Sequence, residues 1–365
     1  MMRLLRVELR RLWARRVTRW ASAVVLLLVA LGAFTAYQTA KPPSAQQIAE
    51  AKQFYADELE WWESEGEQAV AECAEGAEAE GMTPAEWGCE NMEPRLENYL
   101  PPTQTFVPSA EQLEESSGAA EAAPEGEEPA PNAAAVQEIQ QSVWHDWGGL
   151  GTLDELAALL LMVALVVGVS FVTAEVNSGS MGMWLTFEPR RRRVYWSKAA
   201  AAALGTVPLV AVGFGLLVGT SYAAYASFDA LGTMTGDVWV QVAGFAGRLV
   251  AAGALAAVIG VALGILLKHA AAAVGLVAAG VWASAVFAYP LGELQRWLPT
   301  TNVTAWLNGG NVFVVDDCAP DADGMFVCTQ AEHVVTAGQG GLYLLVAGVV
   351  IALLSVVVFR RRDVS

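Results

Sequence analysis

Three widespread catalytic signatures are missing from this sequence. Its 365 residues contain no GxxxxGK[ST] loop, no HExxH and no GxSxG. The first absence excludes a phosphate-binding loop that would let the chain hydrolyse ATP by itself. The other two exclude a protease of the HExxH type and a serine hydrolase with a nucleophile elbow. We therefore expect a chain that is not an enzyme on its own.

Ionisable residues are nearly missing from the long apolar runs. Arg248 lies inside one run and Glu175 at the boundary of another. A secondary carrier driven by protons or sodium needs carboxylates or paired broken helices within the membrane. An intramembrane hydrolase needs buried Asp, Ser–His or zinc ligands there. The scarcity disfavours both classes and fits a machine whose energy comes from another subunit.

Arg248 has two interpretations. The run 238–267 would be about 45 Å long as a helix, longer than the roughly 30 Å hydrocarbon core. The guanidinium could therefore snorkel to the outer headgroups. Alternatively, it faces a polar cavity between subunits and meets substrate or a carboxylate. The length of the run favours snorkelling, and a place on the pathway stays open.

Lysine is scarce, with 4 lysines against 17 arginines, and charge is unevenly distributed. Residues 41–150 hold 24 Asp and Glu against 3 Lys and Arg, whereas the rest of the chain holds 14 acids and 18 bases. An acidic insert therefore interrupts a mildly basic body. The basic residues stand at the ends of apolar runs rather than in one groove, which disfavours binding to nucleic acid.

Six apolar runs are long enough to cross a bilayer as helices. The sequence therefore predicts an all-α membrane protein with six transmembrane helices, an N-terminal in-plane amphipathic helix and a helical acidic extracellular insert between the first and second spans. The first span covers residues 20–38 and the insert residues 39–150. The region 151–359 holds spans two to six, at 156–174, 199–226, within 238–267, 270–289 and 341–359, with an extracellular loop at 290–340. A cytoplasmic tail covers 360–365.

The distribution of arginine and lysine sets the predicted orientation. Residues 1–19 carry seven arginines opposite Leu5, Leu9 and Leu12, a pattern typical of a helix lying on an anionic membrane surface. A cleavable signal peptide is the alternative, and the long amphipathic start argues against it. With both termini cytoplasmic, 16 of the 21 Lys and Arg lie inside. We expect a multi-pass protein of the bacterial plasma membrane.

The predicted insert has two parts. Residues 44–71 show the spacing of an amphipathic helix, and Thr83-Pro-Ala-Glu86 is typical of a helix start. Residues 109–135 are rich in Glu, Ala and Pro, so we expect a disordered arm there. The insert could attract cationic cargo, gate an outer exit or be a solvated decoration. Trp144–Trp147 is more simply an interfacial belt than a metal site.

All four cysteines fall outside the membrane under this topology. An oxidising exterior permits disulfides, and two local pairs, Cys73–Cys89 and Cys318–Cys328, are favoured among the three connectivities. A metal site built on Cys318, Cys328 and His333 is disfavoured because no further ligand lies nearby in the sequence. We expect no metal in the chain.

The stretch between the second and third runs is the most informative. It turns polar at Glu175 and then carries Gly179, Leu185, Pro189 with a following arginine, and Lys198. It has room for a short helix at 181–187 before Pro189 ends it. This pattern resembles the cytoplasmic loop of ABC-2-type permeases, the membrane subunits of type-2 ATP-binding-cassette exporters. The arginines could also be only a topology signal that keeps the loop inside.

The resemblance implies a permease subunit, most simply of an exporter, coupled through the loop 175–198 to a separate cytoplasmic ATPase. The chain would hold no cofactor, and ATP and Mg would bind the partner. Two permeases, identical copies or paralogues, would pair with two ATPases in contact with membrane lipids. The residues expected to couple to the ATPase are Glu175, Gly179, Met181, Met183, Trp184, Phe187, Pro189, Arg190, Arg191, Arg192, Arg193 and Lys198. Apolar docking would fall to the methionines and aromatics, and the arginines would meet ATPase acids or lipid phosphates.

A second hypothesis is a membrane-anchored sensor or assembly factor, whose acidic extracellular region binds a partner while the spans only hold it. A neighbouring reading frame for a soluble Walker-motif ATPase would discriminate between the two. The sequence does not identify the cargo, because the expected pathway has few specific polar groups.

Overall fold

The computed structural model describes residues 2–79, 83–85, 87–101, 104–108, 136, 139, 142, 144, 149–320 and 326–361. The side chains of residues 2, 3, 90, 184, 185, 317–320 and 326–329 are outside that description. The chain forms two compact units. One comprises Met1–Tyr37 with Thr105–Ser365, and the other is Gln38–Gln104. The expected disordered arm at 109–135, and His145 to Trp147, lie outside the described residues.

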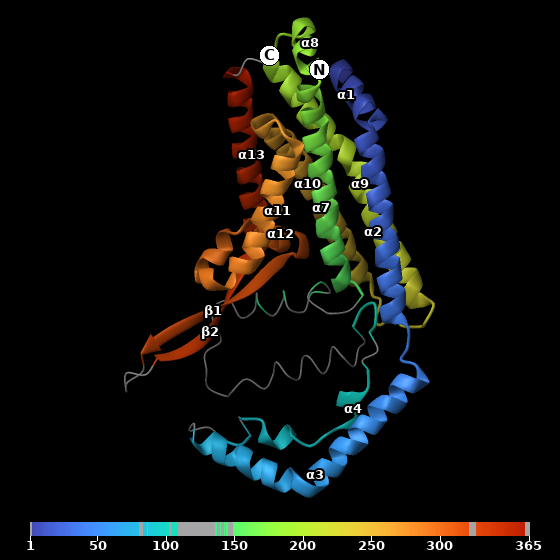
Figure 1. The fold of residues 1–365 in the computed structure, drawn as a ribbon, viewed down its shortest axis with the longest axis vertical. Helices are drawn as coiled ribbons and strands as arrows, with labels where there is room; N and C mark the ends of the chain where they lie inside the picture. Colours follow the sequence, from blue (N-terminus) through green and yellow to red (C-terminus); the bar gives the residue numbers. More distant parts are fainter. Residues whose placement is uncertain are drawn as a thin grey trace. The chain divides into compact units, whose positions relative to one another are not determined.

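The first unit is a bundle of long helices (Figure 1). Six helices in the described part of the chain are long and apolar enough to cross a membrane, which confirms the predicted number of spans. They are α2 (Arg16–Ala40), α7 (Gly151–Asn177), α9 (Arg191–Ala226), α10 (Gly236–Leu267), α11 (Ala270–Phe287) and α13 (Ala337–Arg361). A further helix, α1 (Met2–Ala14), precedes α2, and the short α8 (Ser180–Phe187) lies between α7 and α9.

Close backbone packing joins α7 to α10 at the centre of this bundle. A Cβ added to Gly168 would overlap the backbone of Ala257, and one added to Gly260 would overlap the backbone of Leu165. Small residues allow this approach, which in a membrane supplies the van der Waals contact that holds helices together. On the other side of α10, the Ser355 hydroxyl of α13 donates to the carbonyl of Ala262 at 3.1 Å. α10 is thus packed against both α7 and α13.

The region 290–340 contains a strand hairpin that the sequence did not predict. After α11 come a 3-10 segment, η2 (Tyr289–Trp297), and the helix α12 (Pro299–Asn308). Two antiparallel strands follow, β1 (Gly310–Pro320) and β2 (Phe326–Thr336), paired from Gly310↔Thr336 to Pro320↔Phe326. The expectation of an all-α fold is therefore wrong here. Valines favour extended backbone, and Phe313 and Val335 bury against Ala305 of α12.

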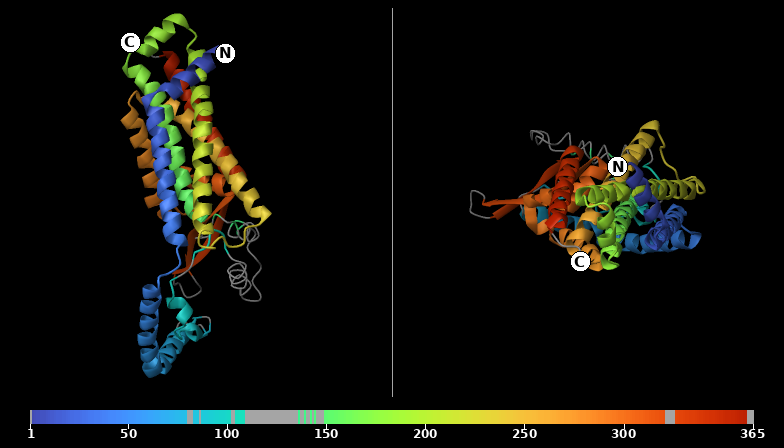
Figure 2. Two further views of the ribbon diagram at one scale, coloured as in Figure 1. Left: turned by 90° about the vertical axis from the view of Figure 1, so that its right-hand side faces the viewer. Right: turned by 90° about the horizontal axis from the view of Figure 1, so that it is seen from above.

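The two ends of the bundle differ in what they carry. α8, the beginning of α1 and the end of α13 lie at one end, and the hairpin of β1 and β2 lies at the other (Figures 1 and 2). The Arg191 guanidinium donates to the carbonyl of Phe359 at 3.1 Å, which ties the start of α9 to the end of α13. The candidate site is at this α8 end.

The second unit is built on α3 (Ala45–Ala79), longer than the helix expected at 44–71. A disulfide joins Cys73 of α3 to Cys89, at the start of the 3-10 turn η1 (Cys89–Asn91). The short α4 (Leu96–Tyr99) places Tyr99 against Phe54 and Tyr55 of α3. At the expected helix start, the N–H of Trp87 donates to the carbonyl of Thr83 at 3.0 Å, and Glu86 lies outside the described residues.

Candidate functional site

A left-handed glycine separates α8 from the end of α7. Gly179 has φ +69°, a conformation that costs glycine little and a residue with Cβ much more. The N–H of Ser178 donates to Ala174 and that of Gly179 to Val176, so two of the last four carbonyls of α7 are satisfied. After this turn the chain enters α8 at Ser180. The positive φ at position 179 therefore explains why the sequence has glycine there.

The helix α8 exposes two apolar side chains on one face and buries a third, Met181. Met183 and Phe187 are 68% and 80% exposed and lie four residues apart, on one face of the helix. Met181 is 1% exposed, so it anchors α8 to the bundle and is not available for docking. The side chains of Trp184 and Leu185 are outside the described part. Pro189 follows the end of α8, and Arg190 precedes the first residue of α9.

A buried network of four charges lies beneath α8. The Lys198 ammonium donates to both carboxylate oxygens of Glu8, at 3.1 and 3.2 Å. The same ammonium forms an ion pair with Glu175 at 2.6 Å. The side chains of Lys198 and Glu8 are each 1% exposed. One lysine on α9 therefore joins a carboxylate on α1 to a carboxylate on α7.

Arg15 completes the network from the bend between α1 and α2. Its guanidinium forms an ion pair and a hydrogen bond with Glu175 and also donates to the carbonyl of Phe171 at 2.8 Å. The Phe171 ring lies close to both cations, with its centroid 4.8 Å from the Arg15 guanidinium and 4.9 Å from the Lys198 ammonium. Both distances allow cation–π attraction.

The network is electrically balanced. The formal charges of the two carboxylates and the two cations sum to zero. This balance matters because an unpaired buried charge strongly destabilises the fold. The sequence pattern includes Glu175 and Lys198 among the expected coupling residues. It gives no role to Glu8 or Arg15. A signal existed for Glu8, because it is the one acid among residues 1–19 and shares a helical face with Leu5 and Leu12.

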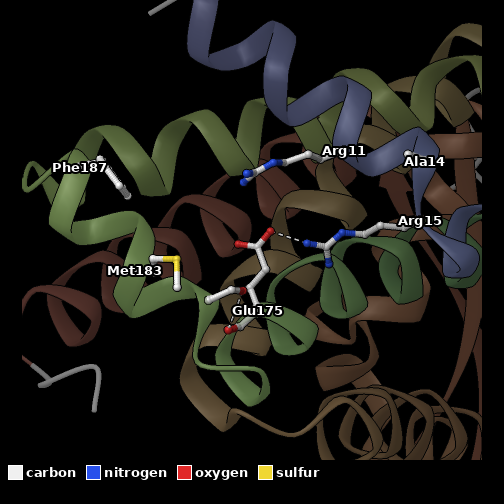
Figure 3. A pocket seen from close by; sticks show the side chains of 7 residues that line it. Arg11, Ala14, Arg15, Glu175, Met183 and Phe187 are labelled. Atoms are coloured by element: carbon white, nitrogen blue, oxygen red, sulfur yellow. Dashed lines mark hydrogen bonds and ion pairs between the residues drawn. The ribbon is translucent and has the colours of Figure 1, made fainter.

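A groove opens between α1 and α8 above this network (Figure 3). Its volume is about 480 Å³. Glu175 and Arg15 form its floor, and the exposed Met183 and Phe187 line the α8 side (Figure 3). Arg11 and Ala14 of α1 and Ser180 of α8 complete it. The groove brings the exposed apolar edge of α8 next to the buried charges.

Arg248 lies away from this end of the bundle, beside α12. A Cβ added to Gly309 would be 3.4 Å from its Nη1, and the Trp306 indole donates to the Arg248 carbonyl at 3.0 Å. Gly309 follows the last residue of α12, where a helix terminus carries partial negative charge. The Arg248 guanidinium is therefore close to the end of α12. Its roles at lipid headgroups or on the transport pathway stay predictions.

Cysteines and metal ligands complete the candidate residues. The strand register sets Cys318 opposite Cys328. Cys73–Cys89 is a disulfide, as expected from the sequence. Among the residues that the structure describes, no group of three His, Cys, Asp or Glu is arranged to hold a metal ion.

Comparison with known proteins identifies the class of membrane protein to which the chain belongs. Six long apolar helices define a multi-pass membrane protein. A family model described as ABC-2 family transporter protein matches residues 2–364, so the chain belongs to the ABC-2 transporter family. It is a permease subunit without an ATPase catalytic site, of a family whose members partner with ABC ATPases. Curated proteins and solved structures give no significant match.

Proposed function

We propose that this permease forms the membrane pathway of an ATP-driven exporter and that α8 is its coupling helix. The observation that carries the proposal is the pair Met183 and Phe187, both strongly exposed at the α8 end of the bundle. Apolar side chains on a short helix between two spans are suited to docking on a cytoplasmic ATPase. Trp184 belongs to the docking set by its place in α8, and Met181 supports the helix from beneath.

The buried network gives α8 a mechanical connection to three helices. α8 follows α7 after Ser178 and Gly179 and precedes α9 by three residues. Glu175, at the last turn of α7, meets Arg15 at the bend between α1 and α2. Lys198, in the first turns of α9, meets both Glu175 and Glu8 of α1. Force applied to α8 would therefore reach α1, α7 and α9 together. Glu175 and Lys198 transmit the motion, and Gly179 and Pro189 set the angle of α8.

We further propose an orientation with the α8 end in the bacterial cytoplasm. It places both termini inside and α1 in the plane of the membrane surface, with its arginines on headgroups. The unit Gln38–Gln104 and the hairpin then lie outside, together with all four cysteines. A disulfide between Cys73 and Cys89 is compatible with an oxidising exterior.

The complete transporter would contain two permeases, as identical copies or as paralogues, and two ATPase subunits. ATP and Mg would bind the ATPases, and this chain would hold no cofactor. Closure of the ATPases on ATP would move α8 and open the pathway between the permeases. The acidic insert would act at the outer side, on cargo or on a partner.

Co-purification tests the docking face. We would express the full chain with the ATPase from the adjoining reading frame and replace Met183 and Phe187 with glutamate. The double variant should insert in the membrane as the wild type does but lose the ATPase. The matched control is Phe54→Glu, an exposed aromatic on α3 in the second unit. If the M183E/F187E variant retains the ATPase, α8 is not the docking helix.

A further inference from the structure

A second cavity at the α8 end is lined almost entirely by arginine. It has a volume of about 540 Å³ and lies where the start of α9 meets the end of α13. The hydrogen bond from Arg191 to the Phe359 carbonyl holds these two helix ends together, and the Tyr195 hydroxyl donates to Ala352 at 3.1 Å one turn further on. The lining residues are Pro189, Arg190, Arg191, Arg192, Arg193 and Arg360.

The charges of this cavity differ from those of the buried network. Arg15 and Lys198 each meet a carboxylate, whereas Arg192, Arg193 and Arg360 form no ion pair with any acid among the described residues. No described acid lines the cavity. The first turn of α9, which carries three of these arginines, adds the partial positive charge of a helix N-terminus. Five guanidinium groups in one cavity repel one another and favour an anion.

The apolar residues next to the arginines indicate which anion. On α9, Arg192 and the exposed Trp196 are four residues apart and share a face. On α13, Arg360, Val357 and Leu353 repeat at helical spacing, and all three are exposed. Both helices are candidate membrane spans. On each helix, exposed apolar side chains follow a cation at the end of the span.

We propose that this arginine cavity binds the phosphate of an anionic phospholipid headgroup, with the acyl chains along Trp196, Val357 and Leu353. Guanidinium groups hold phosphate oxygens by paired, charge-assisted hydrogen bonds. A soluble phosphate or an acidic surface of the ATPase would also meet the arginines, but neither would use the apolar side chains that follow them. The lipid would join α9 to α13, and it would do so whether or not α8 docks on an ATPase.

The test uses the purified full chain in mixed micelles of a neutral detergent and phosphatidylcholine. Phosphatidylglycerol is titrated in, and the lipid that stays bound is measured by native mass spectrometry. The variant is R192Q/R193Q/R360Q, which keeps the hydrogen bond from Arg191 to the Phe359 carbonyl. The matched control is K52Q/R95Q/R296Q, which removes three exposed cations that lie outside both α1 and the cavity. Pyrophosphate in place of lipid tests a soluble anion, and co-expression with the ATPase tests a protein contact.

We expect the cavity variant to bind phosphatidylglycerol on the order of 100-fold more weakly, and Arg360→Gln alone about fivefold more weakly. The control should stay close to the wild type. The single variant keeps the test valid if the triple variant unfolds. Equal binding by the cavity variants and the wild type would overturn the proposal. So would tighter binding of pyrophosphate than of phosphatidylglycerol, or loss of the ATPase from the triple variant with lipid binding unchanged.

Discussion

Lys198 donates hydrogen bonds to both carboxylate oxygens of Glu8, a residue 190 positions earlier in the chain. The pair connects the first helix of the permease to the helix that follows α8. Glu175, at the end of α7, meets the same ammonium at 2.6 Å. Three helices thus share one buried cation directly beneath the segment that we assign to ATPase coupling. The stability of this end of the bundle should depend on the balance of these charges.

Lys198→Met should destabilise the protein strongly. Glu8 would remain buried without its partner, and removal of one member of a buried pair typically costs about 3–5 kcal/mol. Glu175 would keep Arg15. Thermal unfolding of the detergent-solubilised full chain measures the loss. The control is Lys268→Met in the exposed turn between α10 and α11, where we expect a change of about 0.5 kcal/mol or less.

The double variant E8L/K198M should recover most of that loss. Leucine at position 8 continues the apolar face of Leu5 and Leu12, and apolar replacement of a complete buried pair is often neutral. A double variant as unstable as Lys198→Met alone would show that the charges of Glu8 and Lys198 are not coupled.

Loss of the disulfide should loosen the second unit. Cys73 and Cys89 are 16 positions apart, and closing a loop of that size stabilises a fold by about 3 kcal/mol. The C73S/C89S variant of the full chain should therefore be cut faster by protease within α3 than the wild type. C318S/C328S is the control and should leave cleavage of α3 unchanged. Equal cleavage of α3 in all three proteins would contradict a stabilising role for this bridge.

Cys318 and Cys328 should form a second disulfide. Directly opposed residues of antiparallel strands have Cα atoms about 4.5–5.5 Å apart, within the range that a disulfide spans. The register sets these two cysteines opposite each other. Alkylation of the mature protein without reductant, followed by mass spectrometry, should reveal no accessible thiol. Labelling of these two cysteines in exported material would place the hairpin in a reducing compartment and contradict the proposed topology.

Tyr289 should titrate later than an ordinary tyrosine. It lies two residues beyond α11 and donates a hydrogen bond to the Asp316 carboxylate of β1. That hydrogen bond and the negative charge of Asp316 raise the pKa of Tyr289 above 10. Because the fold favours the neutral hydroxyl, the contribution of this contact is present below about pH 10 and is lost as the pH rises through the raised pKa.

Asp316→Asn removes the charge and should shift the pKa of Tyr289 down. The measurement is the phenolate absorbance of each protein minus that of its Tyr289→Phe counterpart, which removes the signal of the other tyrosines. An unchanged titration of Tyr289 in D316N would show that the contact does not form in solution.

The sequence predicted the parts of the fold that rest on local pattern. Six spans follow from apolar length alone, and α8 follows from the apolar residues before Pro189. The turn at Gly179 belonged to the same recognisable pattern. Each of these depends on residues adjacent in the chain, where a helix period or a glycine acts directly.

What the sequence missed depends on distant partners. Nothing near Lys198 in the chain indicates Glu8, and Arg15 was one of seven arginines in a helix expected to face headgroups. The hairpin was hidden by its polar residues, because its apolar ones bury against α12 only in the folded chain. Met181 and Met183 are the same residue type in the same short helix, so the sequence does not distinguish them. Only the fold shows that the first is buried and the second exposed.

Photo-cross-linking from Phe187 tests the central claim most directly. A benzophenone amino acid replaces Phe187, or Phe54 as the control, in intact cells that express the permease and its neighbouring ATPase. Irradiation should join position 187 to a Walker-motif ATPase and leave position 54 unlinked to it. If position 187 is cross-linked only to lipid, to other proteins or to nothing, α8 is not the coupling helix of this permease.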